Sequence, residues 1–331
     1  MTSFNILFTS IGRRVALVRL FRAALARVKL KGKIIGADLL TTAPALWPAD
    51  GRYRVCPVGE PGYIPQLLEI CQREKVRLLV PLIDPELTVL ARNRERFAEL
   101  GTTVLISHPD TISICQDKSR TNDFFRQNSI PAARVYRPEE LAAGQVQYPV
   151  LVKPAYGSGS QGVFKANNER ELSFFIDYVP RALIQEFLAG REYTIDVLAD
   201  FQGRVRCIVP RLRMEVRAGE VSKGMTVRSQ QVMEMAKGVV EKLPGAAGPL
   251  TVQAFMTGNG LKFVEINPRF GGGFPLSAQA GADFPGWIIE LTLAREPGIP
   301  FDRWEEGLVM LRYDEAIFVK REGLPGLDNH K

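Results

Sequence analysis

The strongest signal in this chain of 331 residues is the stretch 262–269, KFVEINPR, which runs into Gly271-Gly272-Gly273. Strand alternation predicts that Glu265 and Asn267 share one face, with Val264 and Ile266 on the other. A carboxylate and an amide oxygen on one face are the hard ligands that Mg²⁺ accepts. The stretch therefore predicts a strand that holds a divalent cation. Arg269 beside it is placed to neutralise charge on a transferring phosphoryl group.

A second strand upstream brings a further oxygen ligand. If Gly258-Asn259-Gly260 is a three-residue hairpin loop, Thr257 pairs with Leu261 and Gln253 pairs with Glu265. Gln253 then joins the same cluster. The alternative is a half-polar strand facing solvent, which the three glycines after it disfavour.

A glycine-rich loop lies in the stretch 148–165, YPVLVKPAYGSGSQGVFK, where Gly157, Gly159 and Gly162 match GxGxxG. A dinucleotide-binding loop opens a helix, whereas the β-like residues 163–166 follow here. Strand, glycine loop and strand predict instead a flap that folds over phosphates, with the ammonium of Lys153 directed at them. The alternative is an ordinary Gly/Ser hairpin with a solvated lysine.

A linker between two lobes is predicted in the stretch 183–196, LIQEFLAGREYTID, where two strands are interrupted at Gly190. Such a linker offers backbone groups to adenine and a carboxylate to ribose hydroxyls. The alternative is a surface strand that carries two glutamates.

The first 110 residues alternate short apolar runs with helical patterns. This alternation predicts a parallel sheet with covering helices, with strands at 5–9, 33–38, 77–82 and 103–106 and helices at 13–28, 63–74 and 85–100. Asp84-Pro85-Glu86 is interpreted as an N-cap, a first-turn proline and a first-turn acid. A second role, facing a ligand at the end of the strand, stays open.

The pattern changes near residues 108–118. A larger α+β domain is predicted after that boundary, with helices at 117–127, 169–178, 229–243 and 284–294 and strands at 150–154, 162–166, 182–187, 192–199, 205–209, 251–256 and 262–267.

Composition excludes several classes of protein. Apolar residues at 46% and charged residues at 24% are typical of a globular chain, and no apolar run reaches the roughly 18–20 residues of a membrane span. The start of the chain is interpreted as a first strand rather than a signal peptide. The four cysteines are widely spaced, which indicates free or buried thiols in a reducing cytoplasm. Only two histidines are present, which disfavours a His-rich zinc site or a His-dependent relay.

The net charge of +7 is dispersed along the chain. No block of Lys and Arg interleaved with aromatic residues is present, so a small anionic ligand is favoured over a nucleic acid.

Together and in this order, these segments resemble the ATP-grasp superfamily, and most closely one ATP-grasp unit of the carbamoyl phosphate synthase large subunit. The resemblance implies an N-terminal parallel-sheet α/β domain that precedes the ATP-grasp fold (1–115). A two-lobed α+β ATP-grasp domain follows, with a small lobe that carries the glycine flap (116–190) and a large lobe with the magnesium site and a C-terminal tail (191–331).

The resemblance also implies roles for individual residues. The ATP phosphates would be contacted by Lys118 and Lys153 and covered by Gly157, Gly159 and Gly162. Adenine and ribose would be bound by Glu186, Phe187, Leu188 and Glu192. Two Mg²⁺ or Mn²⁺ ions would be held by Gln253, Glu265 and Asn267, and Arg269 and Lys153 would act on the transferring phosphate.

The stretch 211–226, RLRMEVRAGEVSKGMT, is more basic than a bicarbonate site requires. It resembles the arginine-rich strand and lysine loop of carboxylate–amine ligases, so Arg211, Arg213 and Lys223 are candidate substrate residues. The chain also carries one ATP-grasp unit where the synthase carries two, and shows no obvious regulatory or glutaminase-docking region.

The implied activity is a cytoplasmic, ATP- and Mg²⁺-dependent ligase that converts a carboxylate into an acyl phosphate, releases ADP and passes the acyl group to an amine. Its partners are then a small-molecule carboxylate and amine, without nucleic acid or membrane, and a homodimer is an open alternative to a monomer.

Three alternatives to this activity remain: a partial synthase subunit that phosphorylates bicarbonate or another small carboxylate for a partner subunit, an inactive ATP-binding regulator, and a nicotinamide-dependent dehydrogenase. The last is disfavoured because no strand–GxGxxG–helix unit is present. The two substrates are not readable, because their pockets lie on variable loops.

Overall fold

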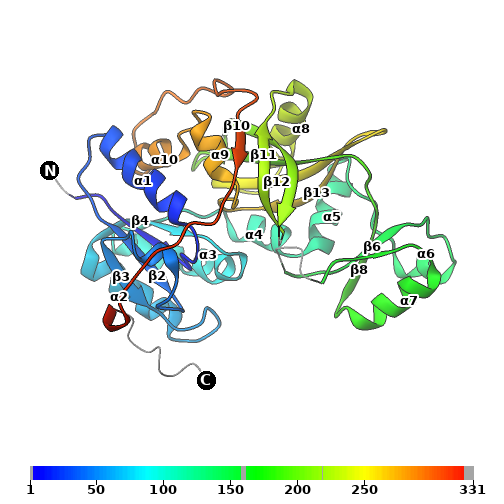
Figure 1. Cartoon of the computed structure of the whole chain (residues 1–331), viewed down its shortest axis with the longest axis horizontal. Coiled ribbons are helices and arrows are strands. Elements are labelled where there is room, and N and C mark those ends of the chain that lie inside the picture. Colours follow the sequence, from blue (N-terminus) through cyan, green and yellow to red (C-terminus); the bar gives the residue numbers. More distant parts are fainter. Residues whose placement is uncertain (1–2, 158–161, 218, 324–331) are drawn as a thin grey trace.

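The computed structural model describes residues 3–157, 162–217 and 219–323. Figure 1 shows three parts in a row: an N-terminal domain, a large lobe in the middle and a small lobe that projects at the far end. The C-terminal segment leaves the large lobe and runs back across the N-terminal domain.

The N-terminal domain is a parallel sheet of strand order β3-β2-β1-β4-β5. Its elements are β1 (Asn5–Thr9), α1 (Val15–Arg27), β2 (Ile34–Asp38), η1 (Pro44–Leu46), β3 (Gly51–Arg54), α2 (Tyr63–Glu74), β4 (Val76–Pro81), α3 (Asp84–Glu99), β5 (Thr103–Val104) and α4 (Pro109–Gln116). Ile6 and Phe8 of β1 pack in the core that contains α1, whereas Leu7 packs in the core that contains α2 and α3. The central strands are therefore buried on both faces, as parallel sheets require.

The predicted parallel sheet is confirmed, and β3 is an additional strand that the sequence did not reveal. It lies at the edge of the sheet, and its residues alternate between half-buried and exposed. Four residues with this alternation carry too little apolar signal to stand out.

The predicted N-cap at Asp84 is wrong by one residue. Ile83 is the N-cap of α3 and Asp84 is the first helical residue, so its carboxylate is free to pair elsewhere. Glu86 completes the turn, because its fully buried carboxylate accepts hydrogen bonds from the backbone N–H of Leu82 (2.6 Å) and the hydroxyl of Tyr63 (2.7 Å). Burial raises the pKa of Glu86.

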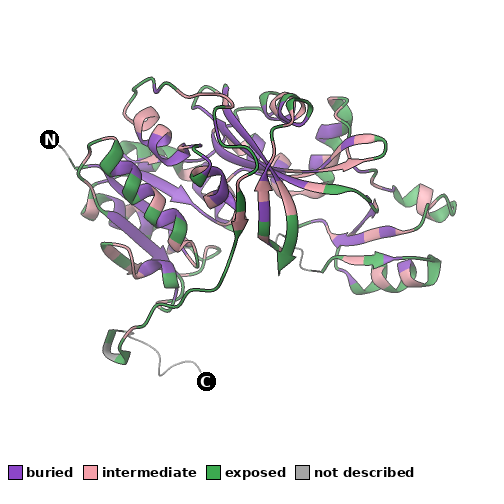
Figure 2. Ribbon diagram, turned by 45° about the horizontal axis from the view of Figure 1, so that its top comes forward, coloured by how far each residue is buried: buried purple, intermediate pink, exposed green. Residues whose placement is uncertain are grey.

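The large lobe is an antiparallel sheet that β14 completes at one edge, with strand order β13-β12-β9-β10-β11-β14. Its elements are β9 (Arg191–Ala199), β10 (Val205–Arg217), β11 (Glu220–Thr226), α8 (Gln230–Glu241), β12 (Gly248–Thr257), β13 (Gly260–Asn267), α9 (Phe274–Gln279), α10 (Phe284–Thr292) and β14 (Val309–Leu311). Its core is continuous with that of the N-terminal domain, and the rings of Phe21 and Phe270 meet edge to face at 5.8 Å between them. Figure 2 shows buried residues along the central strands of both sheets.

Two predictions about these strands are wrong in detail. β10 continues to Arg217 instead of ending at Val209, because its second half alternates charged residues with apolar ones instead of forming an apolar run. The β12–β13 hairpin has a two-residue turn, so Thr257 pairs with Gly260. A register shift between Gln253 and Ala254 then restores the predicted pairing of Gln253 with Glu265. The extra residue of this bulge also places Val264 on the same cavity as Glu265, against the predicted alternation.

The small lobe is a three-stranded antiparallel sheet of order β7-β6-β8. Its elements are α6 (Pro138–Ala142), β6 (Val150–Pro154), β7 (Phe164–Ala166), α7 (Glu169–Tyr178) and β8 (Ala182–Glu186), and α5 (Lys118–Gln127) joins it to the N-terminal domain. Strand pairing of β6 with β7 confirms the strand–glycine loop–strand hairpin.

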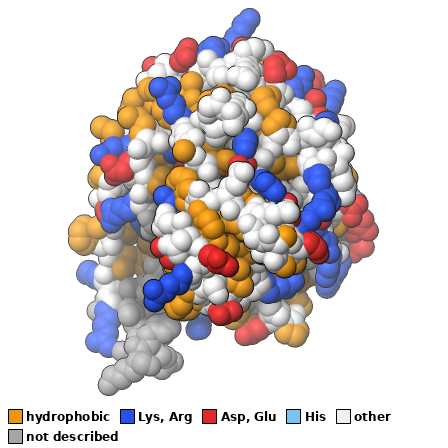
Figure 3. All heavy atoms as spheres, turned by 90° about the vertical axis from the view of Figure 1, so that its right-hand side faces the viewer, with side chains coloured by type: hydrophobic (Ala, Val, Ile, Leu, Met, Phe, Trp, Pro, Cys, Tyr) orange, Lys and Arg blue, Asp and Glu red, His pale blue; other side chains and the backbone are white. Residues whose placement is uncertain are grey.

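The exterior of the small lobe is only partly apolar. Phe174 and Tyr178 of α7 stack on each other and are 63% and 64% exposed. From the small-lobe end, Lys and Arg side chains are interspersed with hydrophobic and acidic ones (Figure 3). Within the described residues, no helix combines the length and the apolar character that a bilayer crossing requires. All four cysteines are free thiols, as predicted.

Candidate active site

A cavity of about 440 Å³ lies between the two lobes of the second half of the chain, and we call it the lobe cavity. The small lobe contributes β6 and β8, and the large lobe contributes β12 and β13. Its walls bring together most of the residues predicted to bind a nucleotide and a metal: Lys118, Lys153, Gly157, Glu186, Phe187, Leu188, Gln253 and Glu265.

Lys153 supplies a buried positive charge to this cavity. It lies near the end of β6, its side chain is 9% exposed, and its ammonium has no hydrogen-bonding partner among the described residues. Burial lowers the pKa of Lys153 to about 8; nearby Glu265 raises it and nearby Lys118 lowers it further. A buried ammonium without a partner is costly, so the site favours an anionic ligand that supplies one.

Lys118 fixes the start of the glycine loop. Asp117 caps α5 by accepting from the backbone N–H of Ser119 (2.8 Å), and the Lys118 ammonium that follows donates to the Gly157 carbonyl (2.6 Å). Gly157 and Gly162 have φ values of +111° and +68°, which only glycine adopts readily. Gly159 lies outside the described residues.

The linker after β8 forms the apolar end of the lobe cavity. Phe187 and Leu188 line it together with Leu151, Val163 and Phe255. The Glu186 carboxylate is held at this end, because it accepts from the Arg134 backbone N–H (2.8 Å) and the Lys262 ammonium (2.6 Å). An apolar slot of this kind suits a planar heterocycle.

The predicted metal ligands lie on two paired strands. Gln253 of β12 faces Glu265 of β13, and Asn267 is two residues further along β13. The Gln253 amide and the Glu265 carboxylate have no hydrogen-bonding partner in the described part of the chain, and the Asn267 oxygen receives one long contact from Arg269 (3.4 Å). Within that part, no group of three or more His, Cys, Asp or Glu side chains could hold an ion. One carboxylate and two amides fit a Mg²⁺ ion that takes its remaining ligands from phosphates and water.

A second cavity, of about 360 Å³, adjoins the first and shares Gln253 and Glu265 with it. We call it the arginine cavity, because Arg14, Arg211, Arg213 and Arg269 line it. All four of these arginines are paired with carboxylates, and Arg14 lies 3.5 Å from Glu220. Arg211 binds Asp196 (2.7 and 3.0 Å), Arg213 lies 3.3 Å from Glu192, and Arg269 binds Asp84 (2.8 and 2.6 Å).

The pairing leaves one buried nitrogen free. Arg211 is 1% exposed, and its Nη1 has no partner among the described residues. Nε of Arg213, in contrast, is the atom that lies 3.3 Å from the Glu192 carboxylate. The chain approaches the Arg211 guanidinium closely, because a Cβ on Gly273 would lie 2.3 Å from Arg211 Nη1. A buried donor without an acceptor beside a cavity indicates an anionic ligand.

Burial affects the charged groups of this cavity in opposite directions. Burial lowers the pKa of Arg269, but the Asp84 carboxylate outweighs it and the pKa is raised. Burial raises the pKa of Glu192, and the nearby Glu265 adds to this while Arg213 opposes it. Burial also lowers the pKa of Arg14. The nearby Glu220 carboxylate opposes this shift, whereas the nearby cations Arg269 and Arg312 add to it.

Two predicted residues lie apart from their expected neighbours. Glu192, predicted beside ribose, lines the arginine cavity and pairs with Arg213. Lys223, predicted beside the substrate, lies on the β10–β11 hairpin, where its half-exposed ammonium binds Glu215 (2.6 Å).

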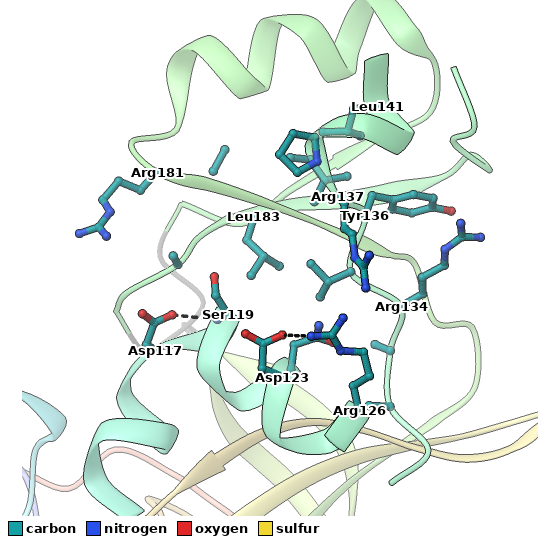
Figure 4. Close-up of a pocket in the computed structure, with 18 of the residues that line it drawn as sticks. Asp117, Ser119, Asp123, Arg126, Arg134, Tyr136, Arg137, Leu141, Arg181 and Leu183 are labelled. Carbon is teal, nitrogen blue, oxygen red and sulfur yellow. Dashed lines mark hydrogen bonds and ion pairs between the residues drawn. The ribbon is translucent and has the colours of Figure 1, made fainter. Parts of the chain in front are cut away.

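A third, open groove of about 800 Å³ lies between α5 and the segment 130–138. Figure 4 shows that its charged side chains come from both walls, with Arg126 bound to Asp123 on α5 and with Arg134 and Arg137 on the segment opposite. Arg134 is bound to Glu140 (2.5 Å). None of the described residues predicted for the site lines this groove, so it is not the candidate active site.

Sequence reasoning missed the carboxylates that hold the arginines. Asp196 lies on β9, 15 residues from Arg211, and Asp84 lies on α3, 185 residues from Arg269. The only available signal was the second role left open for Asp84. Arg14, in the turn before α1, also lines the arginine cavity.

Comparison with protein families gives two matches in this order. A PylC-like N-terminal domain matches residues 6–105, and an ATP-grasp domain matches residues 115–273.

Relatives and solved structures agree with these matches. The arginine-specific large chain of carbamoyl phosphate synthase from Halalkalibacterium halodurans is 26% identical over 247 residues, which are 67% of this chain and 22% of that protein. This chain thus spans about a fifth of that relative's length. The biotin carboxylase domain of Hydrogenobacter thermophilus 2-oxoglutarate carboxylase, solved with MgADP and bicarbonate, has a TM-score of 0.72 at 16% identity and covers 93% of this chain and 74% of its own. L-amino acid ligase from Bacillus licheniformis has a TM-score of 0.67 at 16% identity and covers 88% and 75%.

The fold, the order of the domains and the family matches lead to the same assignment. The chain is a PylC-like N-terminal domain followed by a domain of the ATP-grasp superfamily, similar to the ATP-grasp units of the carbamoyl phosphate synthase large chain.

Proposed function

We propose that this protein is an ATP- and Mg²⁺-dependent ligase that activates a carboxylate as an acyl phosphate and transfers the acyl group to an amine. The observation that carries the proposal is the pair of adjoining cavities. One has a buried, unpartnered ammonium beside an apolar slot, and the other has a buried, unpartnered guanidinium nitrogen on Arg211. Gln253 and Glu265 lie at their junction, where a phosphoryl group would pass from one ligand to the other.

ATP occupies the lobe cavity in this proposal. Its adenine lies in the slot formed by Phe187 and Leu188, with its phosphates at Lys153 and Lys118 and under the loop that carries Gly157, Gly159 and Gly162. Glu186 and Glu192 are the candidate ribose ligands, although Glu192 reaches the ribose only if it leaves Arg213.

Gln253, Glu265 and Asn267 hold Mg²⁺ or Mn²⁺ at the junction of the cavities, as one ion or two. A divalent cation there neutralises charge on the phosphates.

The carboxylate substrate lies in the arginine cavity, where Arg211 offers its free Nη1 and Arg213 supplies further positive charge. An oxygen of this carboxylate forms a bond to the γ-phosphorus while the bond from that phosphorus to the β-phosphate oxygen breaks, and ADP leaves. Arg269 and Lys153 neutralise the charge that develops on the transferred group. The amine then attacks the acyl carbon, loses a proton and displaces phosphate. Positioning and charge neutralisation thus account for the chemistry without histidine.

The test uses hydroxylamine, which traps acyl phosphates as coloured hydroxamates and replaces the unknown amine. The protein is incubated with MgATP, hydroxylamine and a panel of carboxylates that includes bicarbonate. We expect ADP and hydroxamate with at least one organic carboxylate, and no AMP or pyrophosphate.

Two glutamate variants localise the activity. Glu265→Gln should abolish hydroxamate formation, whereas the matched change Glu241→Gln on the exposed face of α8 should leave it unchanged. Activity with bicarbonate alone would favour the partial-synthase alternative, and ATP binding without ADP release from any carboxylate would favour the regulator.

A further inference from the structure

A fourth cavity, of about 530 Å³, lies beneath the C-terminal segment 312–317. We call this segment the strap and the space below it the strap cavity. The turn after β1 and the first residues of α1 form its floor, and the strap forms its roof. In Figure 1 the strap is part of the red trace that runs from β14 toward the N-terminal domain.

The strap cavity continues the series formed by the other two. It shares Arg14, Ile83, Glu220, Gly271 and Gly272 with the arginine cavity, which in turn shares two residues with the lobe cavity. A ligand in the strap cavity can therefore reach an acyl group in the arginine cavity without crossing the lobe cavity.

The floor of the strap cavity lies where open parallel sheets bind ligands. In the order β3-β2-β1-β4-β5, the chain direction across the sheet reverses between β1 and β4, and the turn after β1 opens at that crevice. Ser10 in this turn has φ +47°, which a non-glycine residue rarely adopts. The surrounding contacts hold it there, because its hydroxyl donates to Glu86 (3.1 Å). Such held strain concentrates at functional sites.

Polar contacts hold the strap to both sides. Arg312 binds Glu220 (2.9 Å) on the large lobe, and Glu315 binds Arg19 (3.2 Å) on α1. These pairs are exposed or half-exposed, and each such pair contributes only about 0–1 kcal/mol. Arg312 also donates from its backbone N–H to the Ser222 carbonyl (2.9 Å) and from its guanidinium to the Gly272 carbonyl, and Asp314 pairs with Arg13 and Arg217. A ligand that enters thus displaces several contacts, each of them weak.

The charges in the strap cavity are mixed. Four arginines face three carboxylates, and they pair with one another: Arg13 lies 3.8 Å from Asp314, Arg14 3.5 Å and Arg312 2.9 Å from Glu220, and Arg19 3.2 Å from Glu315. A ligand that displaces the strap therefore meets Arg13, Arg19 and Glu220 without their partners on the strap. Glu220 lies at the inner end because it also lines the arginine cavity, whereas Arg13 and Arg19 line the strap cavity only. A ligand that carries both charges fits this arrangement better than a simple anion or cation.

We propose that the strap cavity binds the nucleophile, and that this nucleophile is an amine with its own carboxylate, of the amino-acid class. The inference rests on the proposed function. Glu220 binds the ammonium at the mouth of the arginine cavity, and Arg13 and Arg19 bind the carboxylate at the outer end. The amine loses a proton to solvent, its nitrogen forms a bond to the acyl carbon, the bond from that carbon to the phosphate oxygen breaks, and phosphate leaves.

Two tryptophan substitutions on one face of α1 test the location. Ala16 is exposed and lines the strap cavity, while Ala23 is exposed two helical turns further on and lines none of the four cavities. With the carboxylate found in the hydroxamate assay, Ala16→Trp should raise the KM for the amino acid at least tenfold. It should change the KM for ATP and the rate of hydroxamate formation less than twofold, because hydroxylamine is small and uncharged. Ala23→Trp should change none of these, and an unchanged amino-acid KM in Ala16→Trp overturns the location.

Matched ligands test the chemical class. Alanine, leucine and lysine are each compared with the amine left by loss of the carboxylate: ethylamine, isopentylamine and cadaverine. At least one amino acid should have a KM tenfold lower than that of its matched amine. The double variant Arg13→Ala/Arg19→Ala should make the two KM values equal. Equal activity within every pair overturns the class.

Saturation-transfer NMR of the same pairs, with MgADP present, separates the two proposals. If no hydroxamate forms but an amino acid binds the wild type and not Ala16→Trp, the proposed function fails and the binding site stands. If hydroxamate forms but no amino acid binds or acts as nucleophile, the binding site fails alone.

Discussion

The lobe cavity and the arginine cavity share two residues but handle charge in opposite ways. In the lobe cavity, the Lys153 ammonium is buried without a hydrogen bond and the Gln253 amide is likewise unpaired within the described residues. In the arginine cavity, Arg211, Arg213 and Arg269 are each held by a carboxylate from another element. One cavity therefore depends on its ligand for compensation, whereas the other is arranged before any ligand arrives. Loss of a charge should accordingly affect binding in the first and the fold in the second.

The largest expected effect is on the buried pair of the arginine cavity. Asp196→Asn leaves Arg211 without its partner carboxylate, with both side chains at most 3% exposed. Breaking such a pair typically costs about 3–5 kcal/mol of the free energy of unfolding. Chemical denaturation measures this cost. The matched change Asp123→Asn removes an exposed partner of Arg126 and should cost less than about 1 kcal/mol. Equal losses of unfolding free energy in the two variants would contradict the view that the carboxylate pairs of the arginine cavity hold the fold.

The opposite effect is expected at Lys153. Lys153→Met removes a buried charge, so the unliganded protein should gain at most roughly 3 kcal/mol at pH 7, from a pKa lowered from 10.5 to about 8. Between pH 8 and pH 10.5 the unfolded chain binds more protons than the folded one. Wild-type stability therefore rises with pH over this range, and the stability difference between Lys153→Met and the wild type shrinks. ATP affinity should fall roughly 10- to 100-fold, because a hydrogen bond to a charged group contributes about 1.5–3 kcal/mol. Denaturation from pH 7 to 10 and nucleotide titration measure these changes; a destabilised variant at pH 7 would show that Lys153 is already compensated.

Asp84 tests whether the arginine cavity positions its groups. Asp84→Asn weakens the two-point contact with Arg269, so kcat should fall roughly 10- to 100-fold with little change in the KM for ATP. Steady-state kinetics and a thermal melt measure the result. Asp110→Asn, a change of an exposed aspartate on α4, is the control. A loss of stability without a loss of kcat would make Asp84 a structural residue only.

The smallest effect is expected at Lys223, which lies outside both cavities. Lys223→Ala breaks an exposed pair with Glu215 and should cost less than about 1 kcal/mol of stability. The KM for the carboxylate, measured beside Arg213→Ala, decides its predicted role. A rise in this KM comparable to that of Arg213→Ala would show that Lys223 contributes to substrate binding.

Much of the fold was predictable because it follows from local patterns. The apolar strands of the N-terminal sheet and the hairpin around the glycine loop have the expected residues, since their periodicity reflects burial on particular faces. β3 and the second half of β10 were not predictable in this way. Their residues lie at an edge or along a polar cavity, where alternation no longer reports a core.

The residues of the candidate site separate in the same way, into those set by the local sequence and those set by tertiary packing. The sequence by itself determined the strand with Glu265 and Asn267 and the lysine before the glycine loop, because each depends on neighbours along one strand. The pairing of Gln253 with Glu265 was predicted from a three-residue loop, whereas the structure reaches it through a two-residue turn and a register shift. The tertiary structure alone decided that Asp84 holds Arg269, that Asp196 holds Arg211, and that the strap covers a further cavity. These contacts join residues up to hundreds of positions apart, and no local propensity encodes which charged side chains meet once separate elements pack.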